Sequence, residues 1–419
     1  MYQRFLGLPA ICAAIAHAAL AQSTMPGMAG MNHQNMNRAG RYLMNMSSGT
    51  AMNPYSWQMP MRMTEAGTWN LMFMGQAFLV DTQQSGPRGG DKFFSTNWFM
   101  ASAIHKIGRG SLMLTAMLSL EPATVTDRRY PLLFQSGETA YGIPLVDAQH
   151  PHDFVMALSA QYARPLDPDT MLQLYYAVVG DPALGPVAFP HRASAFELPQ
   201  APLGHHWEDS THIANNVATV AVRHKWLRLE ASGFFGSEPN ENRWNIDWGR
   251  MNSWAARVSV APTQNWLAQV STGHLTMPER QEDGNVQRTT ASLQYSRPLD
   301  RGTSWSTSLI WGRNHELLTR RHVNAYLFET LYPVTRRNFL TGRVEVVDKD
   351  ELALPEKLGS TFRIHAYTAG YTHDIGTFSG IETGLGANVT AYGVPSTLTP
   401  FYGDRPWGVN VYLRVRLTR

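Results

Sequence analysis

The composition of this 419-residue chain already separates several classes of protein. Hydrophobic residues make up 43% of the chain and charged residues only 16%, with a formal net charge of +3, whereas soluble domains carry about 25% charged residues. Mean hydropathy is −0.26, and after Leu20 no apolar run approaches the roughly 20 residues that a membrane-spanning helix needs. These values disfavour a cytosolic enzyme, a nucleic-acid binder and a helical transporter, and they leave a membrane β-barrel open.

Residues 1–21 have the pattern of a secretory signal peptide. A basic start at Met1–Arg4 precedes an apolar core at Phe5–Leu20, and alanines flank Leu20 before Gln22, which is the arrangement of a cleavable export signal. A retained N-terminal anchor is the alternative. The single cysteine, Cys12, lies in this segment, so we expect the mature chain to have neither a disulfide nor a thiolate metal ligand.

Residues 22–66 are rich in methionine and show no helix or strand periodicity. Gly, Asn, Pro and Ser stand between the methionines, which argues against a helix that packs on a methionine face. Thioether sulfur is a soft ligand suited to Cu(I) or Ag(I), and because each thioether binds weakly, several must converge. We expect a flexible periplasmic segment that either captures copper or acts as a plug. The candidate ligands are Met25, Met28, Met31, His33 and Met36.

Residues 67–419 show a hydrophobic period of two, which indicates β-strands. Leu and Ala alternate with Ser, Met and Thr in Ser111–Leu120, and Val409–Leu417 alternates in the same way. Strands of about ten residues with one apolar and one polar face are typical of outer-membrane barrels. The prediction is an all-β protein, a transmembrane antiparallel β-barrel in the outer membrane of a Gram-negative-type bacterium. A soluble β-sandwich is the alternative.

The connections between these strands set their number. Short turns alternate with longer loops rich in Gly, Pro, Asp and Asn, and together they predict about sixteen strands, with a range of about 14–18. The last short turn is predicted at His373–Thr377. Short turns face the periplasm and long loops the exterior, so an even number of strands places both ends of the barrel in the periplasm.

Two predicted loops, roughly residues 121–152 and 180–212, are long enough to fold into the lumen. They carry six of the 15 histidines, and imidazole with carboxylate suits borderline ions such as Cu(II) and Zn(II). We expect either a metal site or a hydrogen-bonded network that anchors the loops. The candidate ligands are His150, His152, His191, His205, His206, Glu208, Asp209 and His212.

A hydrolase is the third and least favoured hypothesis for these loops. Ser210 lies close in sequence to Asp209 and His212, but a nucleophile, base and orienting group must lie within hydrogen-bond reach in space. We therefore do not expect an enzyme.

Strand parity assigns four methionines to the lumen. If Leu71 and Phe73 face lipid, the methionines on the same strand face inward, and the same argument applies around Leu114. These methionines would either form a path for a soft metal or pack against the N-terminal segment, and packing is slightly favoured. Met156, in contrast, has the parity of the lipid-facing surface. The four inward methionines are Met72, Met74, Met113 and Met117.

Strand parity also assigns charged side chains to the lumen. Opposed positive and negative groups across a pore would set its ion selectivity, although solvated charges on the wall are an equally good interpretation. The charged residues with inward parity are Arg288, Arg343, Glu345, Arg363, Arg414 and Arg416.

Two resemblances add to this interpretation. The Met-rich leader Met25–Met36 resembles that of copper-resistance protein B type outer-membrane proteins, over about the first tenth of the chain, although the barrel here is longer than theirs. Tyr130–Gln135, Gln149–Asp153 and His205–His212 are similar to an uncharacterised bacterial outer-membrane barrel family associated with metal resistance. The second resemblance spans most of the mature chain and implies metal handling in the envelope.

We therefore expect an outer-membrane barrel that binds copper, confers resistance to it or lets it pass, with another divalent metal such as zinc as the second choice. The alternative is a general diffusion porin for small solutes. The expected partners are outer-membrane lipid, metal ions or small solutes, and either further copies in a homotrimer or a periplasmic metal-handling protein.

Overall fold

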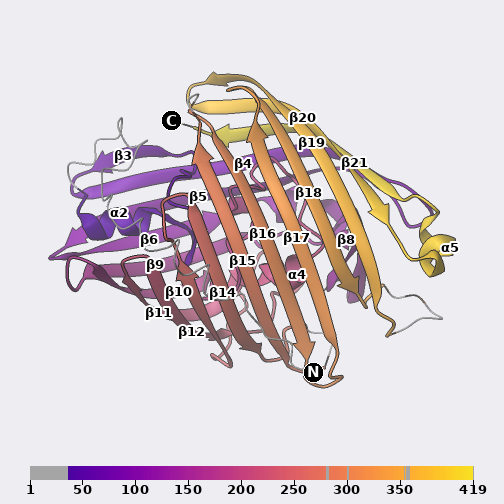
Figure 1. Cartoon of the computed structure of the whole chain (residues 1–419), viewed down its shortest axis with the longest axis horizontal. Helices are drawn as coiled ribbons and strands as arrows, with labels where there is room; N and C mark the ends of the chain where they lie inside the picture. The colour runs from indigo at the N-terminus through magenta and orange to yellow at the C-terminus, as the bar shows by residue number, and fades with distance from the viewer. Residues whose placement is uncertain (1–35, 280–282, 300–301, 353, 355–358, 419) are drawn as a thin grey trace, which may run out of the picture.

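The computed structural model describes residues 36–279, 283–299, 302–352, 354 and 359–418, and it confirms a closed antiparallel barrel of sixteen strands (Figure 1). The ring closes where β21 pairs with β4, with Leu413 opposite Leu79. The sixteen strands are β4 (Trp69–Gln84), β5 (Asp91–Ile107), β6 (Gly110–Leu118), β9 (Val155–Pro165), β10 (Thr170–Gly180), β11 (Ala214–His224), β12 (Leu227–Phe235), β13 (Ser253–Val260), β14 (Trp266–Leu275), β15 (Val286–Pro298), β16 (Ser304–Glu316), β17 (His322–Pro333), β18 (Asn338–Lys349), β19 (Phe362–Phe378), β20 (Ile381–Gly393) and β21 (Trp407–Leu417).

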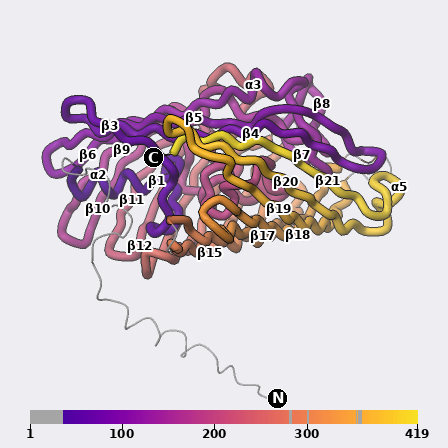
Figure 2. Tube along the Cα trace, turned by 90° about the horizontal axis from the view of Figure 1, so that it is seen from above, coloured from indigo at the N-terminus to yellow at the C-terminus, as the bar shows by residue number. Residues whose placement is uncertain are grey.

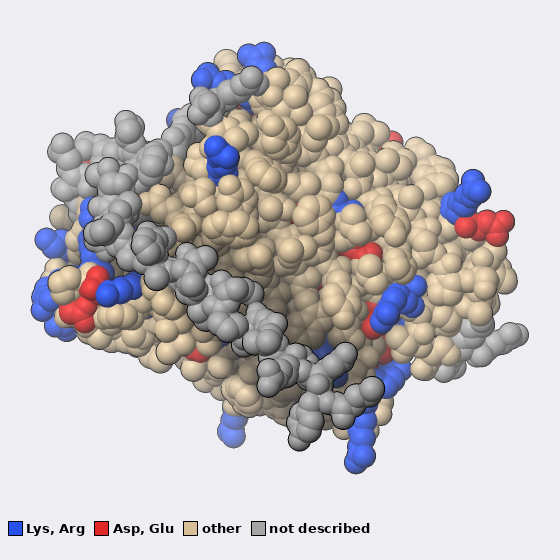
Figure 3. Space-filling model, viewed as in Figure 1, with Lys and Arg blue, Asp and Glu red and all other residues tan. Residues whose placement is uncertain are grey.

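The strands alternate in burial as the period of two requires. Leucine, valine and aromatic side chains point outward, with Leu309 52% and Val411 53% exposed. The face of the barrel in Figure 3 is largely free of charged side chains, and those that are visible gather towards its margins. At the end of the barrel that carries the short turns, Trp266, Tyr295 and Trp305 form consecutive ring contacts at 4.5 and 5.5 Å. Such an apolar band with an aromatic border is the surface of an outer-membrane barrel.

No helix among the described residues is long and apolar enough to cross a membrane.

Short turns join the strands at the end of the barrel where the described chain also ends. The predicted turn at His373–Thr377 is wrong by a few residues, because β19 continues to Phe378 and the chain reverses at Ser379 and Gly380. The register shifts between Asp374 and Gly376, and this irregularity within the strand accounts for the turn-like sequence.

The N-terminal segment is folded in its described part. Asn37 accepts a hydrogen bond from the Gly40 amide and caps a helix, so the expected absence of helix is wrong here. Side-chain capping and packing against β6 and β9 stabilise a helix that is too short to persist alone. The elements of this segment are α2 (Arg38–Met44), β1 (Met46–Ser48), β2 (Ala51–Met52) and β3 (Arg62–Ala66).

Residues 36–61 lie inside the barrel, at the end opposite α5 (Thr399–Tyr402) (Figures 1 and 2). Tyr42 donates to Gln173 on β10 at 2.9 Å. On another part of the wall, Ser56 donates to the carbonyl of Ser296 on β15 at 2.7 Å. We call residues 36–61 the inserted segment, and β3 continues from it onto the barrel wall beside β4.

Four loops of the opposite end position the polar groups discussed below. Loop 2 (119–154) joins β6 to β9, loop 3 (181–213) joins β10 to β11, loop 4 (236–252) joins β12 to β13, and loop 5 (276–285) joins β14 to β15. Loops 2 and 3 are largely buried, as their predicted length allows. Their elements are α3 (Glu121–Thr124), η1 (Thr126–Arg128), β7 (Tyr130–Ala140), β8 (Ile143–Gln149), η2 (Phe189–His191), α4 (His205–Glu208) and η3 (Ser210–Ile213); η4 (Ser396–Leu398) lies in the last loop.

Candidate functional site

Nearly all described methionines meet inside the barrel. Seven come from the five neighbouring strands β4, β5, β6, β9 and β10, one comes from β3, and six come from the inserted segment. Only Met251 and Met277, in loops 4 and 5, lie apart from them, and both are exposed. We call this group the methionine cluster; its members are Met36, Met44, Met46, Met52, Met59, Met61, Met63, Met72, Met74, Met100, Met113, Met117, Met156 and Met171.

The four methionines that parity assigned to the lumen belong to this cluster and are at most 5% exposed. They pack against the inserted segment, so the packing that the sequence slightly favoured is present. Met156 also lies here and is fully buried, so its assignment to the lipid face is wrong. The register slips where β6 meets β9, from Met117–Ala157 to Leu118–Val155, and this β-bulge turns Met156 inward.

A cavity of about 50 Å³ lies between the inserted segment and the barrel wall. Polar groups such as Gln161 and Thr115 share its lining with the methionines. Eight thioethers therefore border one space that also offers amide and hydroxyl oxygen. The methionines that line the cavity are Met44, Met46, Met59, Met61, Met72, Met74, Met100 and Met113.

Of the five predicted ligands in the leader, four fall outside the described residues: Met25, Met28, Met31 and His33. Met36 is described and is 5% exposed. It lies in the methionine cluster, so the structure joins the end of the leader to the methionines of the barrel wall.

Five histidines of loops 2 and 3 form a second group, the histidine cluster, which consists of His150, His152, His205, His206 and His212. Their rings follow one another in space: the centroids are 5.5 Å apart for His152 and His212, 5.4 Å for His212 and His205, 5.3 Å for His205 and His206, and 5.7 Å for His206 and His150. A small cavity of about 20 Å³ borders four of them. The two loops therefore bring together residues that lie more than 50 positions apart in sequence.

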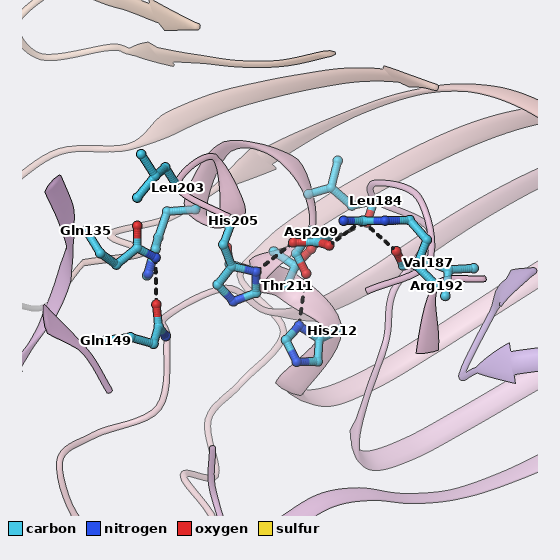
Figure 4. A network of polar contacts seen from close by, with 12 residues as sticks. Gln135, Gln149, Leu184, Val187, Arg192, Leu203, His205, Asp209, Thr211 and His212 are labelled. Atoms are coloured by element: carbon cyan, nitrogen blue, oxygen red, sulfur yellow. Dashed lines mark hydrogen bonds and ion pairs between the residues drawn. The ribbon is translucent and has the colours of Figure 1, made fainter. Parts of the chain in front are cut away.

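Oxygen atoms contact the Nδ1 side of four of these rings, and for His150 the partner is the carbonyl of Pro151 at 3.1 Å. Nδ1 of His152 lies 3.0 Å from Glu121, and that of His205 lies 2.6 Å from Asp209. Nδ1 of His212 lies 2.9 Å from the backbone carbonyl of Asp209. Figure 4 shows Asp209 between His205 and Arg192, with His212 below it. Oxygen contacts of this kind orient histidines that bind metal through Nε2, and Nε2 of His212 is buried without a hydrogen bond.

Burial and neighbouring charge act differently on these imidazoles. Burial lowers the pKa of His205 to about 4 against the opposing effect of Asp209, and burial also lowers the pKa of His150 and His212. In contrast, burial of His206 is outweighed by Glu238 and Glu279, which raise its pKa to about 10. Burial and neighbouring carboxylates thus move the pKa values of adjacent imidazoles in opposite directions within one cluster.

His191 and Glu208 are buried but do not share these contacts. The His191 ring packs edge-on against Trp98, a member of the core around the methionine cluster, with centroids 4.3 Å apart. Neither of its nitrogens is hydrogen-bonded, and burial, followed by the charge of His152, lowers its pKa to about 3. The carboxylate of Glu208 has no hydrogen-bond partner, and burial raises its pKa well above the usual range.

The inward charges of the wall bind loop 3 instead of facing open water. Arg414 pairs with Glu197 at 2.5 Å, and Arg343 pairs with Glu329 of β17 at 2.7 Å and donates to the carbonyl of Gln200 at 3.1 Å. Glu345 accepts from the Leu203 amide at 2.5 Å. Arg416 joins Glu197 at 2.7 Å, and Arg288 donates to Ser210 at 2.8 Å. Five of the six predicted charges therefore point inward, and each has a partner.

The sixth, Arg363, is on the outer face, so its assignment to the lumen is wrong. Its side chain is 58% exposed and pairs with Asp348 at 2.9 Å. Ile364 and Ala366 are the buried neighbours on β19, which fixes the opposite parity for Arg363. An exposed charge is tolerated here because Arg363 lies at the loop end of its strand, where the apolar band gives way to polar surface.

The Ser210 hydroxyl does not contact an imidazole. It donates to Glu238 at 3.3 Å and accepts from Arg288, while His212 contacts the backbone of Asp209. These three residues therefore do not form the serine, histidine and aspartate arrangement of a hydrolase.

Sequence reasoning missed the carboxylates that surround the histidines. Glu121 and Glu138 come from loop 2, Glu238 from loop 4 and Glu279 from loop 5. These carboxylates come from three separate loops, so only the closure of the barrel brings them to the loop 3 histidines.

Solved structures with similar folds share little sequence with this chain, and they include a porin and other outer-membrane proteins. An anion-selective porin from Comamonas acidovorans is 11% identical, with a TM-score of 0.52 over 83% of this chain and 100% of the porin. Salmonella typhi OmpF, in a complex with daunomycin, is 8% identical, with a TM-score of 0.52 over 85% of this chain and 100% of OmpF. A loop-deletion mutant of OmpT, an outer-membrane protein of Vibrio cholerae, is 8% identical, with a TM-score of 0.51 over 83% and 99% of the two chains.

No protein-family model matches the chain, and no curated protein does. At these identities the likeness to porins concerns the fold. Together with the apolar outer surface, it identifies the chain as a porin-like barrel of the Gram-negative outer membrane.

Proposed function

We propose that this barrel binds a soft metal ion, with Cu(I) preferred, among the thioethers inside its lumen and passes it across the outer membrane. The observation that carries the proposal is the convergence of eight methionines on one cavity. Soft thioether ligands select Cu(I) over harder ions such as Mg²⁺ or Ca²⁺. The inserted segment and the wall each supply four of the eight methionines, so an ion bound between them would link the segment to the wall.

Packing alone does not explain why these inward positions carry methionine and not leucine. Methionine fills irregular gaps in cores because it is flexible, and leucine or isoleucine fills most barrel and plug interfaces equally well. Here the inward positions of five neighbouring strands carry methionine, while leucine occupies the outward positions of the same strands, as at Leu114 and Leu158. On these strands, methionine therefore occupies positions that face the lumen, and leucine occupies positions that face the lipid.

The direct test is Cu(I) binding by the refolded full-length chain, measured by competition with a chromophoric chelator. Changing Met72, Met74 and Met113 together to Leu keeps the apolar bulk and removes three ligands, so we expect the affinity for Cu(I) to fall at least tenfold. Ag(I) should follow Cu(I) because it prefers the same ligands.

The matched control changes Met251 and Met277, which are exposed loop methionines, to Leu and should leave the affinity unchanged. Equal affinity in the lumen variant and the control would contradict the proposal, and the methionines would then be packing residues. The leader methionines Met25, Met28 and Met31 are proposed as a first capture site, and their replacement by Leu should weaken Cu(I) binding by the leader peptide.

A general diffusion porin is the second candidate, and the likeness of the fold to porins favours it. It predicts a conductance that copper does not change. In the described structure loop 3 and the inserted segment both lie within the lumen, so solutes would have to pass beside them. Association into a homotrimer, or with a periplasmic metal-handling protein, is proposed for either function.

A further inference from the structure

A buried group of one imidazole and two carboxylates lies where loops 3, 4 and 5 meet. Nδ1 of His206 is 3.6 Å from Oε1 of Glu238 and 3.7 Å from Oε1 of Glu279. Among the described residues, these three side chains form the group of His and acidic ligands whose candidate ligand atoms all lie within 4.8 Å of one another.

The spacing fits ligands around an ion better than it fits hydrogen bonds. Both distances exceed the usual range for a hydrogen bond, which ends at about 3.2 Å for a nitrogen donor. Two ligands of a tetrahedral zinc ion, each roughly 2.1 Å from the metal, lie roughly 3.4 Å from one another. The two distances from Nδ1 therefore lie within a few tenths of an ångström of this value, and the candidate ligand atoms of all three side chains lie within 4.8 Å of one another.

Buried polar atoms that lack a hydrogen bond support the same conclusion. His206 is 5% exposed, and neither of its ring nitrogens makes a hydrogen bond. Oε2 of Glu238 is also buried without one. Buried polar groups are almost always paired, so three such atoms in one small group call for a ligand.

Other contacts hold the carboxylates in place. Oε1 of Glu238 accepts from Ser210 at 3.3 Å, and Oε2 of Glu279 accepts from the Glu138 amide at 3.3 Å. The amide of Glu238 donates to the carbonyl of Pro278 at 2.9 Å, which ties loop 4 to loop 5. Ligating carboxylates in metal sites are typically held by contacts of this kind.

A glycine makes room for the imidazole. Gly137, at a φ of +116°, lies against the His206 ring, and a Cβ there would approach Cε1 to 2.6 Å. A larger residue would strain the backbone and push the ring away from the two glutamates. The position of His206 thus depends on a residue from loop 2 as well.

We propose that His206, Glu238 and Glu279 bind one borderline divalent ion, Cu(II) or Zn(II), at the loop end of the barrel. Imidazole with two carboxylates is a donor set for this class of ion and not for Cu(I). Glu279 keeps 20% of its side chain exposed, so the ion can reach the site from the loop surface. This site is separate from the methionine cavity and goes beyond the function proposed for it.

The experiment titrates the refolded full-length chain with Cu(II) and records its electron paramagnetic resonance spectrum. One bound ion with nitrogen coupling is expected in the unaltered chain. Glu238→Gln with Glu279→Gln keeps the size of both side chains and should weaken Cu(II) binding at least tenfold. Glu241→Gln, a carboxylate of the same loop 4 that contacts Thr139 and the Gly142 amide instead, is the matched control.

Gly137→Ala provides a second variant that leaves every ligand in the chain. It should also weaken Cu(II) binding, while Cu(I) binding in the methionine cavity stays the same in both variants. Equal Cu(II) affinity in the glutamine pair and in the control would overturn the proposed divalent site. Failure of the unaltered chain to bind Cu(I) would instead contradict only the function proposed for the methionines.

Discussion

The two ends of the lumen contain different chemistry in one barrel. Towards the short turns, thioethers from the inserted segment and the wall surround a cavity, and none of them changes charge with pH. Towards the loops, imidazoles and carboxylates meet, and their protonation depends on burial and on each other. Soft ligands suit Cu(I), whereas imidazole and carboxylate suit borderline divalent ions. One lumen therefore presents soft thioethers at one end and borderline ligands at the other.

Loop 3 links the two ends, and cutting its attachment should have the largest effect. Arg192 is fully buried and pairs with Asp209 at 2.8 Å and with Glu329 at 3.0 Å. Arg192→Leu leaves buried carboxylates without this partner, which typically lowers the free energy of unfolding by about 3–5 kcal/mol. Urea unfolding in detergent micelles measures this loss, and single-channel conductance should rise as the loop leaves the wall. Unchanged stability and conductance would mean that loop 3 is held elsewhere.

Two substitutions of Met113 separate its contribution to packing from its contribution to Cu(I) binding. Met113 is 4% exposed, so Met113→Ala should lower the free energy of unfolding by about 2–5 kcal/mol through the cavity it leaves. Met113→Leu conserves volume and should lower it by less than about 1.5 kcal/mol, yet it should weaken Cu(I) binding as Met113→Ala does. If Leu retains full Cu(I) affinity, Met113 contributes packing and not a ligand.

The histidine end should respond to acid, whereas the methionine end should not. The pKa of His205, about 4 in the folded chain, is below its ordinary value near 6.5. The unfolded state therefore binds the proton first, so this contribution to stability is present above pH 6.5 and is lost as the pH falls towards 4. His206 has the opposite sign: its pKa is raised to about 10, so its contribution is present below pH 6.5 and is lost as the pH approaches 10.

The expected outcome is a melting temperature that falls on both sides of a maximum near neutral pH. His205→Asn should reduce the fall in acid, whereas His105→Asn, a change at a half-buried histidine near the short turns, should leave it unchanged. An identical acid profile in the His205 variant would show that other groups control the loops. Cu(I) affinity, corrected for the chelator, should stay constant over the same range of pH.

The sequence predicted the fold well because the signals of a barrel are local. A period of two places Met72 and Leu114 on opposite faces without any knowledge of the neighbouring strands, and the spacing of turns gives the strand number. The errors arise where the pairing between strands determines which way a side chain points. A bulge against β6 turns Met156 inward, and the parity of β19 puts Arg363 outside.

The candidate site was predictable only in part. His205 and His206 stand together in the chain, so their cluster was visible. Glu238 and Glu279 lie in separate loops, and only the closed barrel brings them to His206. That α2 forms within the Met-rich segment also depends on its contact with the wall, because a helix of seven residues has little stability of its own.

The most direct test of two sites with different ligands is X-ray absorption of the refolded chain loaded with one equivalent of copper in each oxidation state. The account predicts sulfur neighbours around Cu(I), and nitrogen and oxygen neighbours without sulfur around Cu(II). The same nitrogen and oxygen shell for both oxidation states would contradict it, because the methionines of the lumen would then take no part in binding.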